Sequence, residues 1–262
     1  MPDKPVAVVI PFYRDTLSES EAISIKQCFK VLSKHPIICI KPSSLSLVKA
    51  EEHFSFSHTV TFDDDFFDGI QGYNRLMLSS RFYKAFLEYE FILLYQLDAF
   101  VFRDDLLYWC NQGFDYIGAP WIRDREYSDI VKMLKSKFQT FYHTKYNVYK
   151  EGLPSNMQFE NKVGNGGFSL RRVKKLYGLS IKYVERIEFY HMQADHRFHE
   201  DVFWSIEVNR KRPELKIPNY RKALNFAFEN HPERCLRLNK NKLPFGCHAW
   251  DKYLSFWEKY MH

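Results

Sequence analysis

Short runs of consecutive apolar residues alternate, in the first part of the chain, with a stretch in which apolar residues recur at helical spacing. Residues 6–10 form a mostly β-branched run closed by Pro11, which is typical of a buried strand. Residues 18–32 carry apolar positions at helical spacing, and residues 36–40 form a second strand-like run that ends at Pro42. This order predicts a parallel pair of strands with a right-handed crossover, the opening of a doubly wound α/β sheet.

The clearest strand signal follows further along the chain. Residues 58–62 predict a short strand, and residues 72–89 predict a helix. Residues 91–95 are continuously apolar, which indicates a strand buried on both faces in the middle of the sheet. Gln96-Leu97-Asp98 comes directly after this strand. A carboxylate is therefore expected at the carboxyl edge of a central strand, where open α/β sheets bind ligands.

The second half of the chain is less regular. Residues 115–121 predict a strand and turn, whereas residues 122–160 are polar, aromatic and weakly periodic and are interpreted as an insertion or a mobile loop. Residues 196–210 predict a helix whose inner face carries Phe198, Val202, Phe203 and Ile206. The sequence shows no internal repeat and no linker between domains, which favours a single domain over residues 1–262.

Composition narrows the class of protein and the kind of partner. The 262 residues are 45% hydrophobic and 27% charged, ordinary globular values that argue against disordered, collagen-like and membrane-spanning classes. The aromatic content of 18% is high, but most of these rings must fill the core. A formal charge of +6 suits an anionic partner such as a nucleotide diphosphate. The sequence contains no RRM or helix-turn-helix signature, so nucleic acid is not expected as a partner.

The cysteines and both ends of the chain bear on location. Five widely spaced cysteines without a C-x-x-C pair argue against a disulfide framework and a zinc knuckle, and favour a reducing compartment. The apolar run 6–10 is too short for a signal peptide or a spanning helix, so we expect a cytoplasmic protein. At the other end, apolar side chains recur at helical spacing and either dock on the protein's own core or form a peripheral contact with the inner face of the plasma membrane. They are Trp250, Tyr253, Leu254, Trp257, Tyr260 and Met261.

Two polar residues are candidate ligands for a cation or a phosphate. Asp98 follows the central strand, and hard divalent cations prefer carboxylates; the alternative is a turn or capping aspartate. His248 follows Gly246, which permits close backbone approach to a ligand, and imidazole binds metal when neutral or phosphate when charged. The alternative for His248 is a hydrogen-bonded structural residue.

Glu200 and Asp201 are candidate proton acceptors, since they precede an apolar run in the helix predicted over residues 196–210. A helix N-terminus stabilises a carboxylate in the first turn as an anion, so we expect it to be ionised at neutral pH. The alternative is ordinary helix charge. The nearby His191, His196 and His199 lack a standard metal-ligand spacing.

The one glycine-dense segment is Gly164-Asn165-Gly166-Gly167. It matches neither the Walker pattern nor G-x-G-x-x-G, so a nucleoside triphosphate or dinucleotide site is not supported. A tight turn that lets backbone amides contact sugar hydroxyls fits the segment, and a plain loop is the alternative.

Six short stretches appear in an order that resembles a known family; they are residues 8–13, 95–98, 116–121, 164–171, 200–203 and 245–250. They resemble the DUF5672 family of bacterial proteins of glycosyltransferase type, often found with surface-polysaccharide genes, and more distantly the GT-A transferases. The resemblance implies a GT-A-like, Rossmann-type α/β fold with a mixed, mostly parallel central sheet flanked by helices. Residues 1–120 would bind the donor, and residues 121–262 would carry the acceptor and catalytic half.

The resemblance also implies an activity and a partner for each half. A sugar would pass from a nucleotide-sugar donor to a hydroxyl of a glycan or lipid-linked acceptor. The donor would be a UDP-sugar, the kind most frequent among such families. The product would belong to a capsule, a lipopolysaccharide or another glycoconjugate. Asp201, beside Glu200, would be the base of an inverting reaction. Donor-binding residues would be Pro11, Tyr13, Asn74, Arg75, Gln96 and Asp98. The sugar and acceptor pocket would be shaped by Trp121, Gly164, Asn165, Gly166 and Gly167.

A divalent cofactor, Mn or Mg, would be held by Asp98 and His248. The D-x-D motif of the GT-A enzymes is degenerate here, because Gln96-Leu97-Asp98 lacks the first carboxylate and Asp98-Ala99-Phe100 lacks the second. Metal dependence therefore stays open. The alternative function is a non-catalytic carbohydrate- or nucleotide-binding module of degenerate transferase type.

Overall fold

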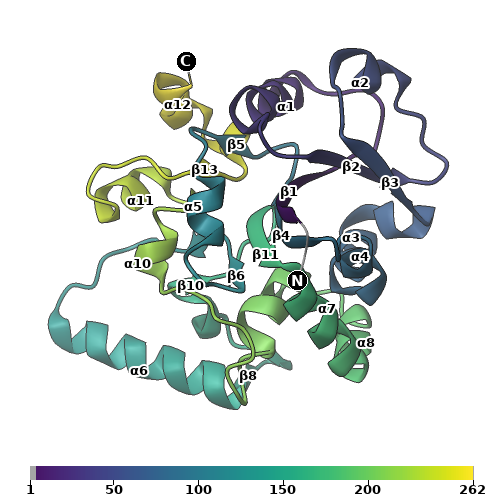
Figure 1. The fold of residues 1–262 in the computed structure, drawn as a ribbon. Helices are drawn as coiled ribbons and strands as arrows, with labels where there is room; N and C mark the ends of the chain where they lie inside the picture. The colour runs from purple at the N-terminus through teal and green to yellow at the C-terminus, as the bar shows by residue number, and fades with distance from the viewer. Residues whose placement is uncertain (1–3, 262) are drawn as a thin grey trace.

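Residues 4–261, which the computed structural model describes, are built around a six-stranded sheet with the order β3-β2-β1-β4-β11-β6 (Figure 1). The first four of these strands run parallel, and β11 runs antiparallel to both of its neighbours. The bounds are β1 Lys4–Pro11, β2 Ile37–Pro42, β3 His58–Phe62, β4 Tyr89–Tyr95, β11 Phe168–Arg172 and β6 Tyr116–Ile117. The parallel opening and the central position of the strand over residues 91–95 are confirmed.

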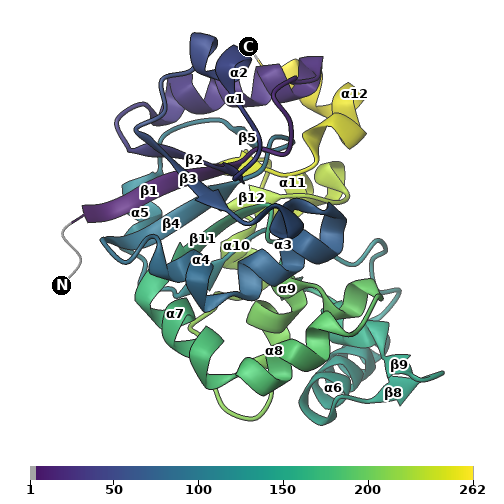
Figure 2. The same ribbon diagram turned by 90° about the vertical axis from the view of Figure 1, so that its right-hand side faces the viewer.

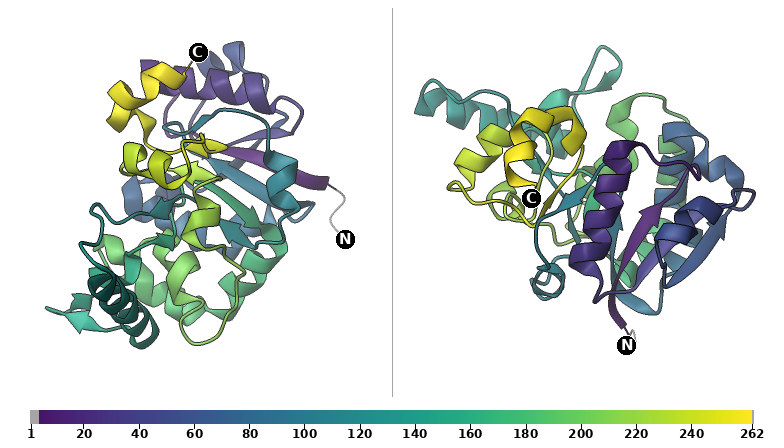
Figure 3. Two further views of the ribbon diagram at one scale, coloured as in Figure 1. Left: turned by 90° about the vertical axis from the view of Figure 1, so that its left-hand side faces the viewer. Right: turned by 90° about the horizontal axis from the view of Figure 1, so that it is seen from above.

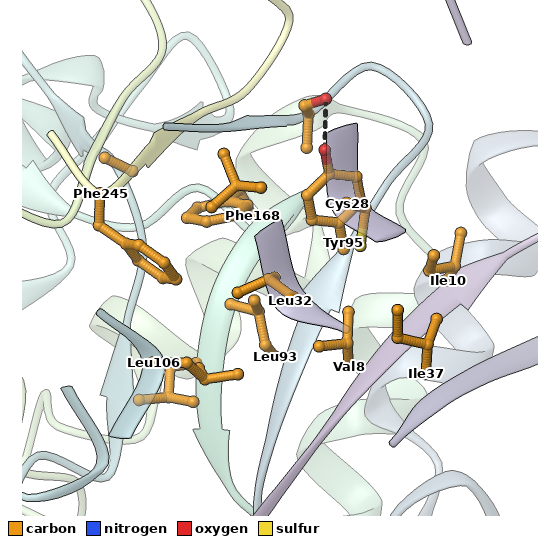
Figure 4. Packing of buried hydrophobic residues seen from close by; sticks show 14 of the residues in the cluster. Val8, Ile10, Cys28, Leu32, Ile37, Leu93, Tyr95, Leu106, Phe168 and Phe245 are labelled. Atoms are coloured by element: carbon orange, nitrogen blue, oxygen red, sulfur yellow. Dashed lines mark hydrogen bonds between the residues drawn. The ribbon is translucent and has the colours of Figure 1, made fainter. Parts of the chain in front are cut away.

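The two central strands are apolar on both faces because each face packs against helices. On β1, Val8 points into one core cluster and Val9 into the other, following the period of two along a strand. Figure 4 shows the first cluster, where Leu93 and Tyr95 of β4 lie with Cys28 and Leu32 of the helix that follows β1. Burial on both faces explains why these segments are continuously apolar rather than alternating.

Helices cover the two faces in separate groups, which Figures 2 and 3 show as layers above and below the sheet. The first face packs against α1 Glu19–Leu32, α2 Val48–His53 and α5 Leu106–Cys110. The second packs against α3 Gly69–Leu78, α4 Ser80–Lys84, α7 Val173–Lys182 and α8 Val184–His191. Ser18 begins α1 with a capping box, in which its hydroxyl accepts from the amide of Glu21 and the Glu21 carboxylate accepts from the amide of Ser18.

The strand directions bring distant segments to one edge of the sheet. The parallel strands β1 and β4 both end at this edge, and the antiparallel β11 begins there, with Phe168 opposite Tyr95. The amide of Gln96 continues the ladder by donating to the carbonyl of Gly167 at 2.8 Å. The segment after β4 and the glycine-rich segment before β11 therefore lie side by side.

A small three-stranded sheet ties the C-terminal part of the chain to the same edge. Its strands are β5 Phe100–Val101, β12 Ala227–Phe228 and β13 Gly246–Cys247, in the order β12-β13-β5. Cys247 pairs with Phe100, and the amide of Trp250 donates to the carbonyl of Asp98 at 3.3 Å. The pairing of β13 with β5 therefore carries His248 to the end of β4.

The apolar C-terminal stripe docks on the protein's own core. Trp250 and Trp257 are buried in a cluster with Phe100 and Phe228, and Tyr253, Tyr260 and Met261 pack against that cluster. The indole of Trp250 also donates to the Ser24 hydroxyl of α1 at 3.1 Å. The elements here are η5 Trp250–Tyr253, α12 Leu254–Trp257 and η6 Glu258–Tyr260. Of the two interpretations of the stripe, docking on the core is the one observed.

Two predicted helices are interrupted. The helix expected over residues 72–89 is divided into α3 and α4, because the extended Ser79 uses its hydroxyl to accept from the amide of Arg81 and begins a new helix. The helix expected over residues 196–210 is present over residues 200–207, where an α-helical turn continues into a π-helix, and its four inner side chains are buried as predicted. The elements of this segment are η3 His196–Phe198, α9 Glu200–Val202 and the π-helix η4 Phe203–Glu207.

The interpretation of residues 122–160 as an insertion or mobile loop is wrong in part, because they contain the 17-residue helix α6 Ile130–Tyr146. Asp129 begins this helix by accepting from the amide of Lys132 at 2.7 Å, and the left-handed Asn147 ends it. The remaining elements are β7 Pro120–Trp121, β8 Tyr149–Lys150, β9 Leu153–Pro154, η2 Asn156–Phe159, β10 Lys162–Val163, η1 Asp64–Phe67, α10 Tyr220–Ala223 and α11 Pro232–Leu238. None of the helices within residues 4–261 combines the length and apolarity needed to cross a bilayer.

Candidate functional site

A cavity of about 520 Å³ opens at the edge where β1 and β4 end and β11 begins. This edge is the switch point of the sheet, since the chain leaves β1 toward β2 on one side and β4 lies on the other. The cavity is lined by Tyr13, Gly69, Ile70, Tyr73, Asn74, Gln96, Asn165, Gly166, Gly167, His199, Glu200, Asp201, His248 and Lys252. Six separate segments of the chain thus meet around one space.

Most of the residues expected at the site lie in the wall of this cavity or contact it. Nine of them are in the wall, and they are Tyr13, Asn74, Gln96, Asn165, Gly166, Gly167, Glu200, Asp201 and His248. Asp98 lies directly behind His248, with its Oδ1 3.1 Å from His248 Nε2.

Besides Asp98, four expected residues do not line the cavity. Pro11 is buried as the last residue of β1. Arg75 turns away and donates to the carbonyl of Asp65 at 2.7 Å. Trp121 packs its ring against Gly164, where a Cβ atom would lie only 2.0 Å from the ring. Trp121 thus contacts the start of the glycine-rich segment and does not line the cavity.

His248 is the centre of a polar cluster. Its Nε2 lies 3.0 Å from Gln96 Oε1 and 3.1 Å from Asp98 Oδ1, and its Nδ1 lies 3.4 Å from Glu229 Oε1. Asn165 joins the cluster, since its Nδ2 donates to Glu229 Oε1 at 2.8 Å. Two carboxylates therefore face one imidazole from opposite sides.

This arrangement fixes the charge of the cluster. Burial by itself lowers the pKa of His248, but the hydrogen bonds and negative charges of Asp98 and Glu229 outweigh it and raise the pKa to about 10. Burial likewise disfavours the Asp98 anion, yet the hydrogen bond and charge of His248 prevail and lower the pKa of Asp98. At neutral pH the cluster thus holds an imidazolium between two carboxylates.

The same atoms also fit as neighbouring ligands of a divalent cation. In an octahedral site with bonds of about 2.1 Å, adjacent ligand atoms are about 3.0 Å apart. The separations of His248 Nε2 from Asp98 Oδ1 and Gln96 Oε1, 3.1 Å and 3.0 Å, match this value. A cation would have to displace the imidazolium proton. No group of three or more His, Cys, Asp or Glu that could hold a metal ion occurs within residues 4–261, so other ligands would have to complete the shell.

Gly167 allows the cluster to form. A Cβ atom at this position would lie 2.1 Å from His248 Nε2 and 2.6 Å from Gln96 Oε1, closer than any side chain tolerates. Similarly, a Cβ atom at Gly166 would lie 2.0 Å from Glu200 Oε1. The glycine density of residues 164–167 is therefore explained by close packing of side chains against the backbone, the Trp121 ring at Gly164 and polar side chains at Gly166 and Gly167.

Replacing Gly167 by alanine is expected to push His248 and Gln96 apart while leaving the sheet intact. Binding of any ligand that uses the cluster should weaken by at least about tenfold, the cost of misplacing one good polar contact. Gly178→Ala is the matched control, because a Cβ atom at that helical position meets nothing within 4 Å, and alanine there should stabilise α7. Equal ligand affinity of both variants by titration calorimetry would contradict the prediction.

A buried ion pair supports the other side of the cavity. Arg171 of β11 is fully buried, and its Nη2 donates to Glu200 Oε1 at 2.8 Å and to the carbonyl of Gly166 at 3.2 Å. The amide of Glu200 donates in turn to Asn74 Oδ1 at 3.0 Å. Among the described side chains of the cavity wall, Glu200 Oε2, Asn74 Nδ2 and the Tyr73 hydroxyl are buried without a hydrogen-bond partner. Because these atoms are covered, a ligand would pair them only after a neighbouring group moves aside.

Asp201 differs from the expectation of an ionised carboxylate. Burial, followed by the negative charges of Glu200 and Glu229, raises the pKa of Asp201 to about 8. The helical segment that was expected to stabilise the anion changes from α to π after Val202, and Asp201 Oδ1 accepts one hydrogen bond, from the amide of Val202 at 2.8 Å. Asp201 is therefore protonated in most molecules at neutral pH and gains its charge in mildly alkaline solution.

The sequence did not single out every residue of the site. Lys252 places a cation at the cavity mouth and lowers the pKa of Asp98 through its charge, but it is one of 38 basic residues with no motif around it. Glu229 follows β12, a strand of two residues that is too short to be recognised from its pattern. Tyr73 lies one residue before Asn74, and its position in the wall depends on the orientation of α3.

The chain was compared with known families and structures. A family model described as "Protein of unknown function (DUF5672)" matches residues 56–248. No curated protein matches the sequence. The galactosyltransferase LgtC, in complex with donor and acceptor sugar analogs, is 12% identical with a TM-score of 0.50. The match covers 92% of this chain and 86% of the LgtC chain. Mouse xyloside xylosyltransferase 1, in its apo form, is 11% identical with a TM-score of 0.52, and the match covers 94% of this chain and 97% of the mouse chain. The predicted GT-A-like fold is confirmed.

Proposed function

The protein belongs to the DUF5672 family, and we propose that it is a glycosyltransferase that moves a sugar from a nucleotide-sugar donor to an acceptor hydroxyl. One observation carries the proposal. In a GT-A-like fold, the cavity at the switch point joins a charged cluster suited to a diphosphate with a carboxyl group whose pKa lies near the working pH. Fold similarity alone would not carry it, because one fold serves many activities.

The donor would bind along the edge formed by β1 and β4. Tyr13, whose side chain is 38% exposed at the cavity, offers a face for stacking a nucleotide base, and a UDP-sugar is the donor we propose. The diphosphate would lie against the His248 imidazolium and the Lys252 ammonium, since charge-assisted hydrogen bonds are the strong ones. The half up to residue 120 would thus supply the base contact, whereas the diphosphate contacts would come from His248 and Lys252 in the other half.

The sugar would occupy the part of the cavity between the glycine-rich segment and α9. A sugar hydroxyl both donates and accepts, so it would pair with Glu200 Oε2 and Asn74 Nδ2 once a small movement of the wall uncovers them. Leaving such buried groups unpaired costs free energy, which favours a substrate that pairs them. A glycan or a lipid-linked sugar of the kind used in surface-polysaccharide synthesis is the acceptor class we propose.

Asp201 would take the proton of the acceptor hydroxyl as its oxygen attacks the anomeric carbon and the bond from that carbon to the diphosphate breaks. A base with a raised pKa is a stronger proton acceptor, and the fraction ionised at pH 7 to 8 is sufficient for catalysis. His248 and Lys252 would stabilise the negative charge of the departing diphosphate. In-line attack by one acceptor inverts the anomeric configuration, which the coupling constant of the product's anomeric proton reports.

Asp98 and His248, with Gln96 beside them, are the residues that would hold a divalent cation, Mn or Mg. When bound, such a cation would stabilise the charge of the leaving diphosphate in place of the imidazolium proton that it displaces. With only two strong protein ligands, metal affinity should depend on phosphate oxygens of the donor. We therefore expect weak metal binding without nucleotide and stronger binding with it.

Replacing Lys252 by alanine is expected to weaken donor binding about tenfold, the effect of losing one charge-assisted hydrogen bond to phosphate. The loss should shrink as salt is raised. Lys174→Ala is the control of equal charge change, because Lys174 begins α7 at the opposite edge of the sheet, where β11 ends. If the two variants bind the nucleotide equally in titration calorimetry, Lys252 does not contact the donor.

The proposal is tested first by binding and then by turnover. Thermal shift and calorimetry with UDP, GDP, CMP and dTDP and their sugars, with and without Mn or Mg, are run on the wild type and on Asp98→Ala. Stabilisation by one nucleotide that is lost in the variant, together with slow hydrolysis of the matching nucleotide sugar, is the expected result. Nucleotide binding without hydrolysis or transfer would favour the non-catalytic binding module, and no binding to any nucleotide would overturn the donor site.

A further inference from the structure

The helix α6 is attached to the protein by its polar side. Its buried residues are Ser136 and Thr140, and the hydroxyl of Ser136 donates to the Glu160 carboxylate at 2.9 Å. Arg210 reaches the other end of the helix and donates to the carbonyl of Thr144. Figures 1 and 3 show α6 at one edge of the molecule, outside the layers that cover the central sheet.

The opposite side of α6 is apolar and open to solvent. Seven large apolar side chains of this helix are between 47% and 75% exposed, and they are Ile130, Val131, Leu134, Phe138, Phe141, Tyr142 and Tyr146. At about 100° of rotation per residue, the first six fall within an arc of about 120°. An amphipathic helix of a soluble domain turns such a stripe toward the core, so this orientation is the reverse of the usual one.

The charged side chains of α6 itself all have one sign. Residues 130–146 contain four lysines and no aspartate or glutamate. Lys135 and Lys137 follow the two borders of the arc, Lys132 lies beyond Lys135, and Lys145 lies near the C-terminal end. A neighbouring cavity of about 650 Å³, between α6 and the region of α10 and α11, carries five basic and three acidic side chains. The surface that contains α6 is therefore both apolar and positively charged.

We propose that the apolar, lysine-bordered face of α6 docks on the surface of a bilayer that contains anionic lipids. Apolar and aromatic side chains enter the boundary between headgroups and acyl chains, while lysines bind the lipid phosphates. A second copy of this chain fits less well, because pairing two identical faces about a twofold axis would bring the lysines of both helices together. This inference does not depend on the transferase activity, and it assigns the membrane contact to α6 instead of the C-terminal stripe.

The test measures flotation of the full chain with vesicles. The wild type is expected to float with vesicles of equal parts phosphatidylglycerol and phosphatidylcholine, less so in high salt, and not with phosphatidylcholine alone. The double variant Leu134→Glu/Phe138→Glu should bind at least about tenfold more weakly, and Lys132→Gln/Lys135→Gln/Lys137→Gln should lose the dependence on salt. Since all five side chains are exposed, circular dichroism should show no change in fold.

Ile181→Glu/Val184→Glu is the matched control, because these apolar residues of α7 and α8 are exposed to a similar degree and the charge change is the same. Binding retained by the control and lost by the α6 variants supports the proposal. Three results would overturn it: a wild type that does not float with anionic vesicles, α6 variants that float like the wild type, or a change confined to oligomeric mass in gel filtration, which would make a second copy the partner.

Discussion

Asp201→Asn is expected to lower turnover by about 10²- to 10⁴-fold, the usual contribution of a general base, while donor affinity stays unchanged. Asparagine has nearly the same shape and keeps the hydrogen bond from the amide of Val202, so the cavity should retain its form. Only the ability to take up a proton is lost. The measurement is the initial rate at saturating donor and acceptor, beside a calorimetric titration of the donor. Full turnover in the variant would remove Asp201 from the base role.

The pH dependence of the reaction gives a second test of the same residue. Because the pKa of Asp201 is raised to about 8, the ionised fraction grows as pH rises from 7 to 9. The wild-type kcat/KM, which reports the free protein, should therefore increase over this range and then level, with an apparent pKa near that value. In Asp201→Asn the residual rate should lose this rise. Asp124→Asn, a change at an exposed carboxylate, should leave the profile as it is.

Stability should respond to the same substitution in the opposite direction. The folded pKa of Asp201 lies above the value of about 4 expected in the unfolded chain, so the native state binds the proton more tightly. Its contribution to stability is greatest below pH 4 and is lost as pH rises toward 8. Asp201→Asn should thus be more stable than the wild type by roughly 1–3 kcal/mol near pH 8, with no gain near pH 4. Urea unfolding at the two pH values measures the difference.

The sequence predicts the part of the fold in which the hydrophobic pattern alone determines the element. β1 and β4 are apolar on both faces, and the run from Phe91 to Tyr95 has the length of a buried strand and is too short for a typical helix. α6 was missed although its apolar residues recur at helical spacing, because residues 122–160 were interpreted as one segment and only residues 130–146 of it carry that spacing. The division of α3 from α4 at Ser79 depends on one side-chain hydrogen bond, which no periodicity reports.

At the candidate site, residues that follow long strands were predictable, and residues held by tertiary contacts were not. Gln96 and Asp98 follow β4, so the sheet itself puts them at the ligand-binding edge. Glu229 and Lys252 arrive through the two-residue strands β12 and β13 and the turn after His248. The pKa of Asp201 depends on burial and on two neighbouring carboxylates, and sequence spacing records neither.

Arg171→Met is expected to destabilise the protein by about 3–5 kcal/mol, the range seen when one partner of a buried ion pair is removed. Arg171 is fully buried, and without its guanidinium Glu200 keeps a charge that no other side chain neutralises. The Tyr83 hydroxyl and the carbonyl of Gly166 also lose a donor. The free energy of unfolding in urea, measured with the wild type under the same conditions, gives the loss.

Arg172→Met is the matched control, since it changes the next residue of the same strand to the same side chain. Arg172 is partly exposed and pairs with Glu90 and Asp115, so its loss should cost less than about 1 kcal/mol. The double variant Arg171→Met/Glu200→Gln should recover part of the stability, because it removes the uncompensated charge as well. Equal losses from Arg171→Met and Arg172→Met would contradict the buried pair. A large loss that Glu200→Gln relieves would show that Arg171 holds the carboxylate beside Asp201, and so couples the core of the sheet to the proposed base.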